Sequence, residues 1–189
     1  IAPGSIALSP FRRHKLLAAL TAQVPGIQGL EAVHVHFVRC SRDPAPEERA
    51  RLDKLLGYGE QWLPADPEGE LYLVVPRPGT ISPWSSKATD ILHNCGLAWV
   101  ERIERGVAYF IRTGGDVNPD GQARMRSLLH DRMLEVVLGD FQDALILFSE
   151  AEPRPVRELD ISTDASGALA RANREWGLAL SADEIEYLA

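Results

Sequence analysis

The sequence is poor in cysteine, in clustered positive charge and in long apolar runs, and each shortage excludes a class of protein. Only Cys40 and Cys95 occur among the 189 residues, whereas small secreted scaffolds carry several cysteines at regular spacings. We therefore expect a reducing, cytoplasmic compartment. The apolar runs are far shorter than the roughly 20 residues of a membrane-spanning helix, and the first residues lack the regions of a signal peptide.

Acidic residues outnumber basic residues by 27 to 20, which gives a net charge of −7 at pH 7. Nucleic-acid binding needs clustered lysine and arginine, and the basic runs here are short and interrupted. We therefore expect neither a nucleic-acid partner nor a membrane partner. With 45% hydrophobic residues the chain can bury a core, so we expect a globular protein. The chain starts without methionine and stops without a helix-ending signal, so we expect a longer parent polypeptide.

Strand and helix patterns alternate from the start of the chain to about position 150. Ser9-Pro10 is typical of a capped helix start, and alternating apolar residues over 30–39 predict a strand. Prolines exclude helix over 76–84, and Ser85 or Ser86 is expected to cap a helix over 87–95. The other expected elements are a strand at 5–8, helices at 43–57 and from 122 to 150 with a break near 139, a polar loop at 64–69, a strand at 70–75, and a hairpin of 98–104 with 107–113.

This order of elements predicts an α+β fold of two ferredoxin-like halves over residues 1–150. The halves are too dissimilar in sequence to be called a repeat. Prolines predict a linker over 151–167, followed by the truncated start of a helical domain at 168–189. There Ser181 and Glu184 have the spacing of a capping box. Trp62, Trp99 and Trp176 are interpreted as core residues.

The patterns that would indicate catalysis are incomplete. The segment from Gly79 to Lys87 has Ser86 where a phosphate-binding loop needs glycine, and Ser85 is too close to Lys87 for a Ser-x-x-Lys pattern. Cys95 lies at an expected helix end and not at a nucleophile elbow. We therefore expect no catalytic residue in this chain.

Two histidines raise the question of a metal site. His34 and His36 point to the same face of the strand at 30–39, which suits a metal pair if further ligands approach. Asp43 and His93 are the nearby candidates. The simpler interpretation is a pair of hydrogen-bonded, partly buried histidines, and we expect no metal site.

One segment resembles a known family. Residues 77–97, here called the signature segment, run from Arg77-Pro78-Gly79-Thr80 through Pro83-Trp84-Ser85-Ser86-Lys87 to Asn94-Cys95-Gly96-Leu97. They resemble the N-terminal domain of the large, single-chain formylglycinamidine ribonucleotide synthases. Further pieces match in the same order along the chain: residues 8–12, 101–106, 130–133, 173–180 and 183–188, the last two resembling the start of that family's helical linker domain.

The resemblance implies a fold like a fused dimer of the family's small accessory subunit. It also implies a parent ligase that converts formylglycinamide ribonucleotide, with ATP and glutamine, to the formylglycinamidine ribonucleotide in purine biosynthesis. ATP and magnesium would bind in the synthetase domain, and ammonia would come from a glutaminase domain. This chain would bind no cofactor, would be inactive alone, and would have those two domains of its own polypeptide as partners.

The resemblance also directs attention to the residues of the signature segment that could face the synthetase domain. A proline-rich segment with exposed hydroxyls loses little entropy on binding, and a helix starting near Lys87 would offer free N–H groups to an anion. Asp90 could hold Lys87 or Arg77. An ordinary loop with Trp84 in the core, and a stand-alone ferredoxin-like interaction or metabolite-binding module, are the alternatives. The expected coupling residues are Arg77, Thr80, Ser82, Trp84, Ser85, Ser86, Lys87 and Asp90.

Overall fold

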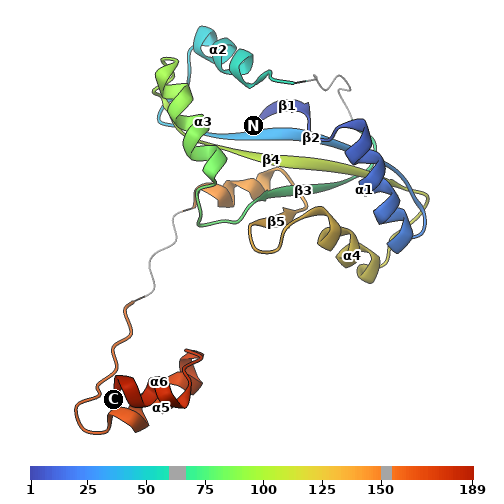
Figure 1. Ribbon diagram of the computed structural model, residues 1–189. Coiled ribbons are helices and arrows are strands. Elements are labelled where there is room, and N and C mark those ends of the chain that lie inside the picture. Colours follow the sequence, from blue (N-terminus) through green and yellow to red (C-terminus); the bar gives the residue numbers. More distant parts are fainter. Residues whose placement is uncertain (60–66, 150–154) are drawn as a thin grey trace. The chain divides into compact units, whose positions relative to one another are not determined.

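The computed structural model describes residues 1–59, 67–149 and 155–189 (Figure 1). The chain forms two compact units, Ile1–Glu150 and Ala151–Ala189. Trp62, the first part of the loop expected at 64–69 and the first part of the expected linker lie outside the described residues. Among the helices that are described, none is long and apolar enough to cross a membrane.

The first unit is built on one antiparallel sheet of five strands in the order β1-β2-β4-β3-β5 (Figure 1). The long central strands β2 and β4 pair along their whole length, from Ile27 with Thr113 to Cys40 with Val100. The α+β fold predicted from the sequence is confirmed. The strands are β1 (Ala2–Ile6), β2 (Ile27–Cys40), β3 (Glu70–Pro76), β4 (Val100–Thr113) and β5 (Glu135–Leu138).

Four helices of this unit begin at a proline. They are α1 (Pro10–Gln23), α2 (Pro46–Leu56), α3 (Pro83–Asn94) and α4 (Pro119–Leu129). Proline suits the first helical position because its missing N–H would have no partner there. The side chains of Ser9, Ser82 and Asn118 each accept a backbone N–H three residues further on, which caps α1, α3 and α4.

The element boundaries show an internal repeat. Helices α1 and α3 start at Pro10 and Pro83, strands β2 and β4 at Ile27 and Val100, and helices α2 and α4 at Pro46 and Pro119. The two members of each pair are separated by the same number of residues along the chain. This constant separation is here called the repeat offset. The buried apolar side chains follow it, since those of α2, Leu52 and Leu56, correspond to those of α4, Met125 and Leu129. The first unit is thus built from two halves of one plan, although their sequences differ too much to show it.

The helices of both halves cover the same face of the sheet. On β4, Ile103 packs with α2 and α3, and Ile111 packs with α1 and α4. The residues between them that point to the opposite face, Ala108 and Phe110, pack against the 3₁₀ helix η1 (Gln142–Phe148). Because side chains alternate along a strand, the two helix pairs share one face and η1 covers the other. In Figure 1, α1 and α4 lie over one end of the sheet and α2 and α3 over the other.

Three predicted elements are wrong. The hairpin is one continuous strand, β4, because Gly106 makes room for a close approach: a Cβ there would lie 2.8 Å from the Val74 carbonyl oxygen. Helix α3 starts at Pro83 and not near Lys87, with Ser82 as its cap. The helix predicted over 122–150 ends at Leu129, and β5 and η1 follow it, since residues 135–138 pair with the free edge of β3.

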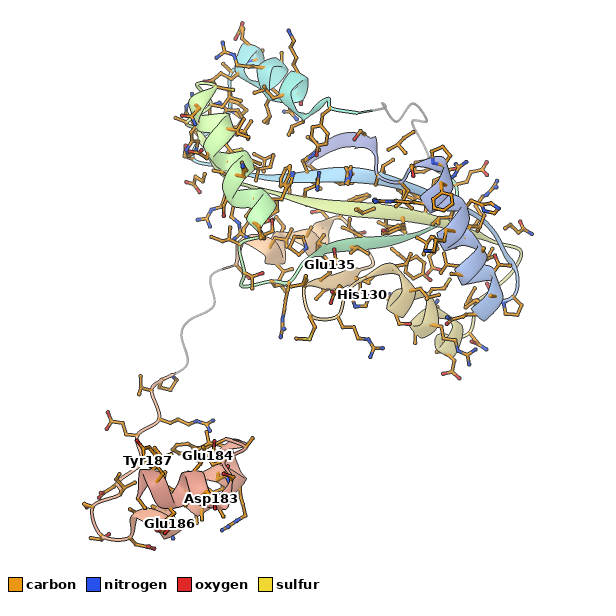
Figure 2. The ribbon with its side chains drawn as sticks, in the orientation of Figure 1. His130, Glu135, Asp183, Glu184, Glu186 and Tyr187 are labelled. Atoms are coloured by element: carbon orange, nitrogen blue, oxygen red, sulfur yellow. The ribbon has the colours of Figure 1, made fainter. Side chains whose placement is uncertain are left out.

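The second unit contains helices α5 (Ala165–Trp176) and α6 (Ala182–Leu188). Gly177 ends α5 in the left-handed conformation, with φ of 66°. The Asn173 amide then bonds both backbone groups of Leu180, which fixes the turn. The predicted capping box of Ser181 and Glu184 is confirmed. Figure 2 labels Glu184 together with Asp183 and Glu186 on α6.

Candidate functional site

The signature segment leaves β3 through a tight turn. Pro78 and Gly79 occupy the middle of this turn, and Gly79 has φ of 80°, which favours glycine. The backbone N–H and the hydroxyl of Thr80 both donate to the Arg77 carbonyl oxygen, at 3.3 and 2.6 Å. Proline and glycine thus fix the path of the chain into α3.

A buried carboxylate holds the segment against the sheet. Glu104 of β4 is fully buried, and its Oε1 atom accepts hydrogen bonds from the Ser82 backbone N–H at 3.2 Å and from Arg102 Nη2 at 2.6 Å. Its Oε2 atom accepts from the Ser82 hydroxyl at 2.7 Å. The Ser82 oxygen in turn caps α3 by accepting the Ser85 N–H. A buried charge with this many donors is satisfied, so the network favours one position of the helix start.

Arg102 extends this network to the preceding turn. Its Nη2 atom donates to the Thr80 carbonyl oxygen at 2.7 Å, and its guanidinium lies 5.5 Å from the centre of the Phe148 ring. One carboxylate and one guanidinium therefore connect the loop, the start of α3, strand β4 and the end of η1. Sequence reasoning assigned no role to Arg102 or Glu104, although residues 101–106 were among the pieces of the resemblance.

The structure separates the expected coupling residues into two groups. Arg77, Thr80, Ser86, Lys87 and Asp90 are exposed. Among the described ion pairs, none joins Asp90 to Lys87 or Arg77. The other three expected residues, which are partly or fully buried, are Ser82, Trp84 and Ser85.

Trp84 and Ser85 face the protein interior. Trp84 packs against the core between α2, α3 and the sheet, with the Arg105 guanidinium 4.9 Å from its ring centre. Ser85 is completely buried, and its hydroxyl has no hydrogen-bond partner within the described part of the chain. The outward side of the segment instead includes Ile81 and Ile91, which are 62% and 50% exposed.

Residues 33–148 match the family described as the formylglycinamide ribonucleotide amidotransferase N-terminal domain. This range contains the whole signature segment and covers more than half of the chain. The chain belongs to this family. The family that the signature segment resembles is therefore confirmed. The chain is part of a formylglycinamide ribonucleotide amidotransferase, an enzyme of purine biosynthesis.

In this amidotransferase domain the two histidines of β2 lie under the helices. His36 is fully buried, and its Nε2 atom lies 2.7 Å from the Tyr58 hydroxyl. Burial, and then the neighbouring His34 and Arg105, lower the pKa of His36 to about 4, although the Ala2 backbone acts in the opposite direction. Burial and Arg105 also lower the pKa of His34. Both rings are therefore neutral at pH 7.

The prediction that these two histidines are hydrogen-bonded is only half right. The Nδ1 atoms of His34 and His36 are buried and make no hydrogen bond of normal geometry among the residues described. Over the same residues, no group of three metal-ligating side chains comes together. Tyr58, which joins His36 to Arg105, follows a helix end and gave no signal in the sequence.

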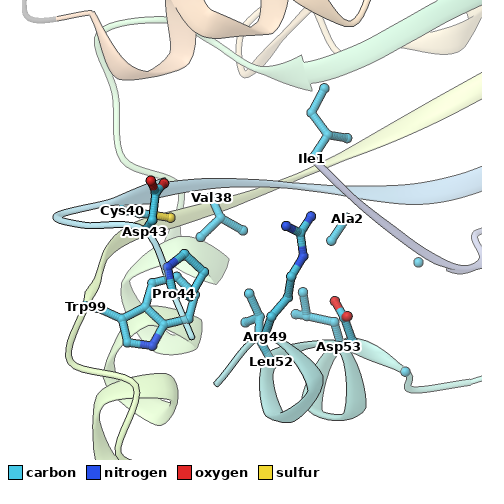
Figure 3. Close-up of a pocket in the computed structure, with 13 residues that line it drawn as sticks. Ile1, Ala2, Val38, Cys40, Asp43, Pro44, Arg49, Leu52, Asp53 and Trp99 are labelled. Atoms are coloured by element: carbon cyan, nitrogen blue, oxygen red, sulfur yellow. The ribbon is translucent and has the colours of Figure 1, made fainter. Parts of the chain in front are cut away.

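A cavity of about 490 Å³ lies between α2 and the strands β1 and β2 (Figure 3). Charged residues at its wall are Asp43, Arg49 and Asp53, and Trp99 contributes an aromatic wall. Cys40 also lines the cavity, and it is a free, exposed cysteine.

Proposed function

We propose that this chain is the non-catalytic N-terminal domain of a glutamine-dependent ligase that makes formylglycinamidine ribonucleotide, and that it docks on the synthetase domain through the signature segment. The outward side of that segment, with Ile81, Lys87, Asp90 and Ile91, is the docking face. Through this contact the domain couples the synthetase to the glutaminase.

The Glu104 network is the observation that carries this proposal. Ser82 and Arg102 donate four hydrogen bonds to Glu104, so the segment is already ordered before any partner binds. Preorganised surfaces bind with less loss of conformational entropy. Two exposed isoleucines beside charged residues supply the apolar centre and polar rim common at interfaces.

The chemistry of the reaction is assigned to other domains. We place ATP and magnesium in the synthetase domain, and the release of ammonia from glutamine in the glutaminase domain. The role of this chain is then to position those domains, and its own residues form and break no bond of the substrate.

A stand-alone metabolite-binding module is the second candidate, and the 490 Å³ cavity beside α2 favours it. Ligand pockets of drug-sized molecules start at about 300 Å³. The two functions differ in the surface they use, because the cavity is lined by β1, β2 and α2 and not by the docking face.

The test uses the full-length ligase with the double substitution Lys87→Ala and Ile91→Ala. We expect glutamine-dependent synthesis to fall about 10-fold relative to ammonia-dependent synthesis, a coupling loss of roughly 1.4 kcal/mol. Glutamate should then be released in excess of product. The matched control is Lys15→Ala with Leu55→Ala, which removes a cation and an exposed leucine from α1 and α2. An unchanged ratio of the two activities would refute coupling through this face.

A further inference from the structure

Five side chains from four separate segments meet near the middle of the helix-covered face of the sheet. They are His34 and His36 of β2, Tyr58 after α2, Trp84 of α3 and Arg105 of β4, here called the Arg105 cluster. Tyr58 hydrogen-bonds His36 at 2.7 Å and accepts from Arg105 at 3.3 Å. The Trp84 ring lies beside both His36 and Arg105, and its centre is 5.7 Å from that of the His36 ring.

Arg105 differs from the other arginines of the sheet in lacking a carboxylate partner among the described residues. Arg39 of β2, and Arg102 and Arg112 of β4, all form ion pairs. Arg105 has instead an aromatic ring and one hydroxyl. A guanidinium has five N–H donors, so most of its donors have no acceptor in the described part of the chain.

The described neighbours of Arg105 offer its side chain one acceptor, the Tyr58 hydroxyl oxygen. The Tyr58 oxygen accepts from Arg105, so its own proton points to His36 Nε2. This assigns the ring proton of neutral His36 to Nδ1, which is buried. The low pKa values keep both imidazoles uncharged. Within the described part of the chain, the positive charge of Arg105 therefore has no carboxylate partner, and it lies in a half-buried place.

The internal repeat shows that the fold does not require this cluster. By the repeat offset, Arg105 corresponds to Ala32, His34 to Val107 and His36 to Tyr109. The equivalent place in the other half is thus filled with apolar and aromatic side chains that pack against α1 and α4. A polar cluster at only one of two equivalent places indicates binding more than packing.

We propose that the Arg105 cluster is a binding site for an oxyanion, a phosphate or carboxylate group held by the Arg105 guanidinium. The guanidinium is oriented by Trp84, and planar guanidinium groups bind such anions through paired hydrogen bonds. His34, Tyr58, Trp84 and Arg105 are each partly exposed, so a small anion can reach them. The anion is either a free small molecule or an acidic side chain of another domain of the polypeptide.

The experiment is an NMR titration of this 189-residue chain with inorganic phosphate at constant ionic strength, followed through the histidine ring signals. We expect a saturable shift of the His34 and His36 signals with a Kd of roughly 1 mM or lower. Bound phosphate should also raise the pKa of His36, because it offsets the charge of Arg105. This change in the His36 pKa is measured on the unmodified chain and needs no substituted variant. No saturable shift, with an unchanged His36 pKa, would overturn the proposal.

Substitutions on β4 test the assignment to Arg105. Arg105→Gln should weaken phosphate binding at least 10-fold, and Arg105→Lys, which keeps the charge but loses the planar group, should weaken it less. The matched control is Arg112→Gln, which removes an exposed arginine of the same strand that is paired with Glu68. Equal weakening by Arg105→Gln and Arg112→Gln would overturn the assignment. Thermal unfolding shows whether each variant is folded.

A longer polypeptide that includes the adjoining domains distinguishes the two sources of the anion. Phosphate binding that persists there indicates a free small molecule. Loss of phosphate binding, together with a His36 pKa already raised, indicates an acidic side chain of a neighbouring domain in the site. The site does not depend on the proposed docking role, since the first titration uses this chain alone.

Discussion

The two halves of the first unit share one plan and differ in what fills the space between helices and sheet. Beneath α1 and α4 the filling is apolar, with Leu20, Tyr72 and Met125 completely or almost completely buried. Beneath α2 and α3 the apolar cluster is interrupted by the Arg105 cluster, and a 490 Å³ cavity adjoins α2. One closed core stabilises the fold, and this leaves the second half free to carry polar groups.

The contrast extends to single positions related by the repeat offset. Glu31 and Glu104 are equivalent in this sense. Glu31 pairs with Arg13 at 2.7 Å, and both side chains are more than 40% exposed. Glu104 is fully buried and holds Ser82 and Arg102. The same residue type thus serves a surface ion pair in one half and an internal anchor in the other.

The largest expected effect comes from removing this anchor. Glu104→Ala should lower the free energy of unfolding by about 3 kcal/mol, because it leaves Arg102 and the Ser82 hydroxyl without their buried acceptor. Glu31→Ala should cost less than about 1 kcal/mol, the range of exposed ion pairs. Urea denaturation of both variants measures the difference. Similar losses would mean that burial does not distinguish the two carboxylates.

The serine caps of α1 and α3 allow the same comparison of the two halves, with a smaller expected change in the free energy of unfolding. Ser9 and Ser82 are also related by the repeat offset, and each caps a helix that starts with proline. Ser82→Ala should cost about 2 kcal/mol, since it removes both a cap and a bond to Glu104. Ser9→Ala should cost about 0.5 kcal/mol, because its capping bond is long, at 3.4 Å, and exposed.

A double-mutant cycle checks the cause of the difference between the serines. Combined with Glu104→Ala, the substitution Ser82→Ala should add only the cost of a cap, about 1 kcal/mol or less. Full additivity of the two changes would show that the Ser82–Glu104 bond contributes nothing to stability.

The fold class was predictable from the sequence because local signals recur along it. The caps at Ser9 and Ser181 and the strand signals at 30–39 and 70–75 are local patterns, and each predicted element is confirmed. The errors arose where distant residues decide the structure. Gly106 is explained only by its contact with β3, and β5 forms only because the edge of β3 is available to it. The start of α3 is a different case, since Ser82-Pro83 repeats the local pattern of Ser9-Pro10 and so could be predicted from the sequence.

The candidate site was predictable in its location and not in its chemistry. The signature segment identified the family from residue types alone. Nothing in the sequence indicates that Glu104 is buried beneath Ser82, or that Arg105 faces Trp84 and Tyr58, since these contacts join segments that are distant along the chain. Whether the exposed residues of the segment contact the synthetase domain stays a prediction.

The smallest of the three main effects concerns pH and the histidines that only β2 carries. The pKa of His36 is about 4 in the folded chain and about 6.5 when unfolded, so between these values the unfolded chain binds more protons. Its contribution to stability is complete above about pH 6.5 and is lost as the pH falls toward 4. We expect the free energy of unfolding to be about 1 kcal/mol lower at pH 5.5 than at pH 7 from this residue.

Urea denaturation at both pH values measures this loss, and His36→Gln, which does not titrate, should remove it. His14→Gln, at an exposed histidine of α1, is the control and should leave the loss unchanged. Tyr109, which occupies the position equivalent to His36 in the other half, has a pKa raised by burial and cannot contribute in this range. A loss that persists in His36→Gln would assign the pH dependence to His34 or to carboxylates, and the polar cluster would then differ from its apolar counterpart in packing alone.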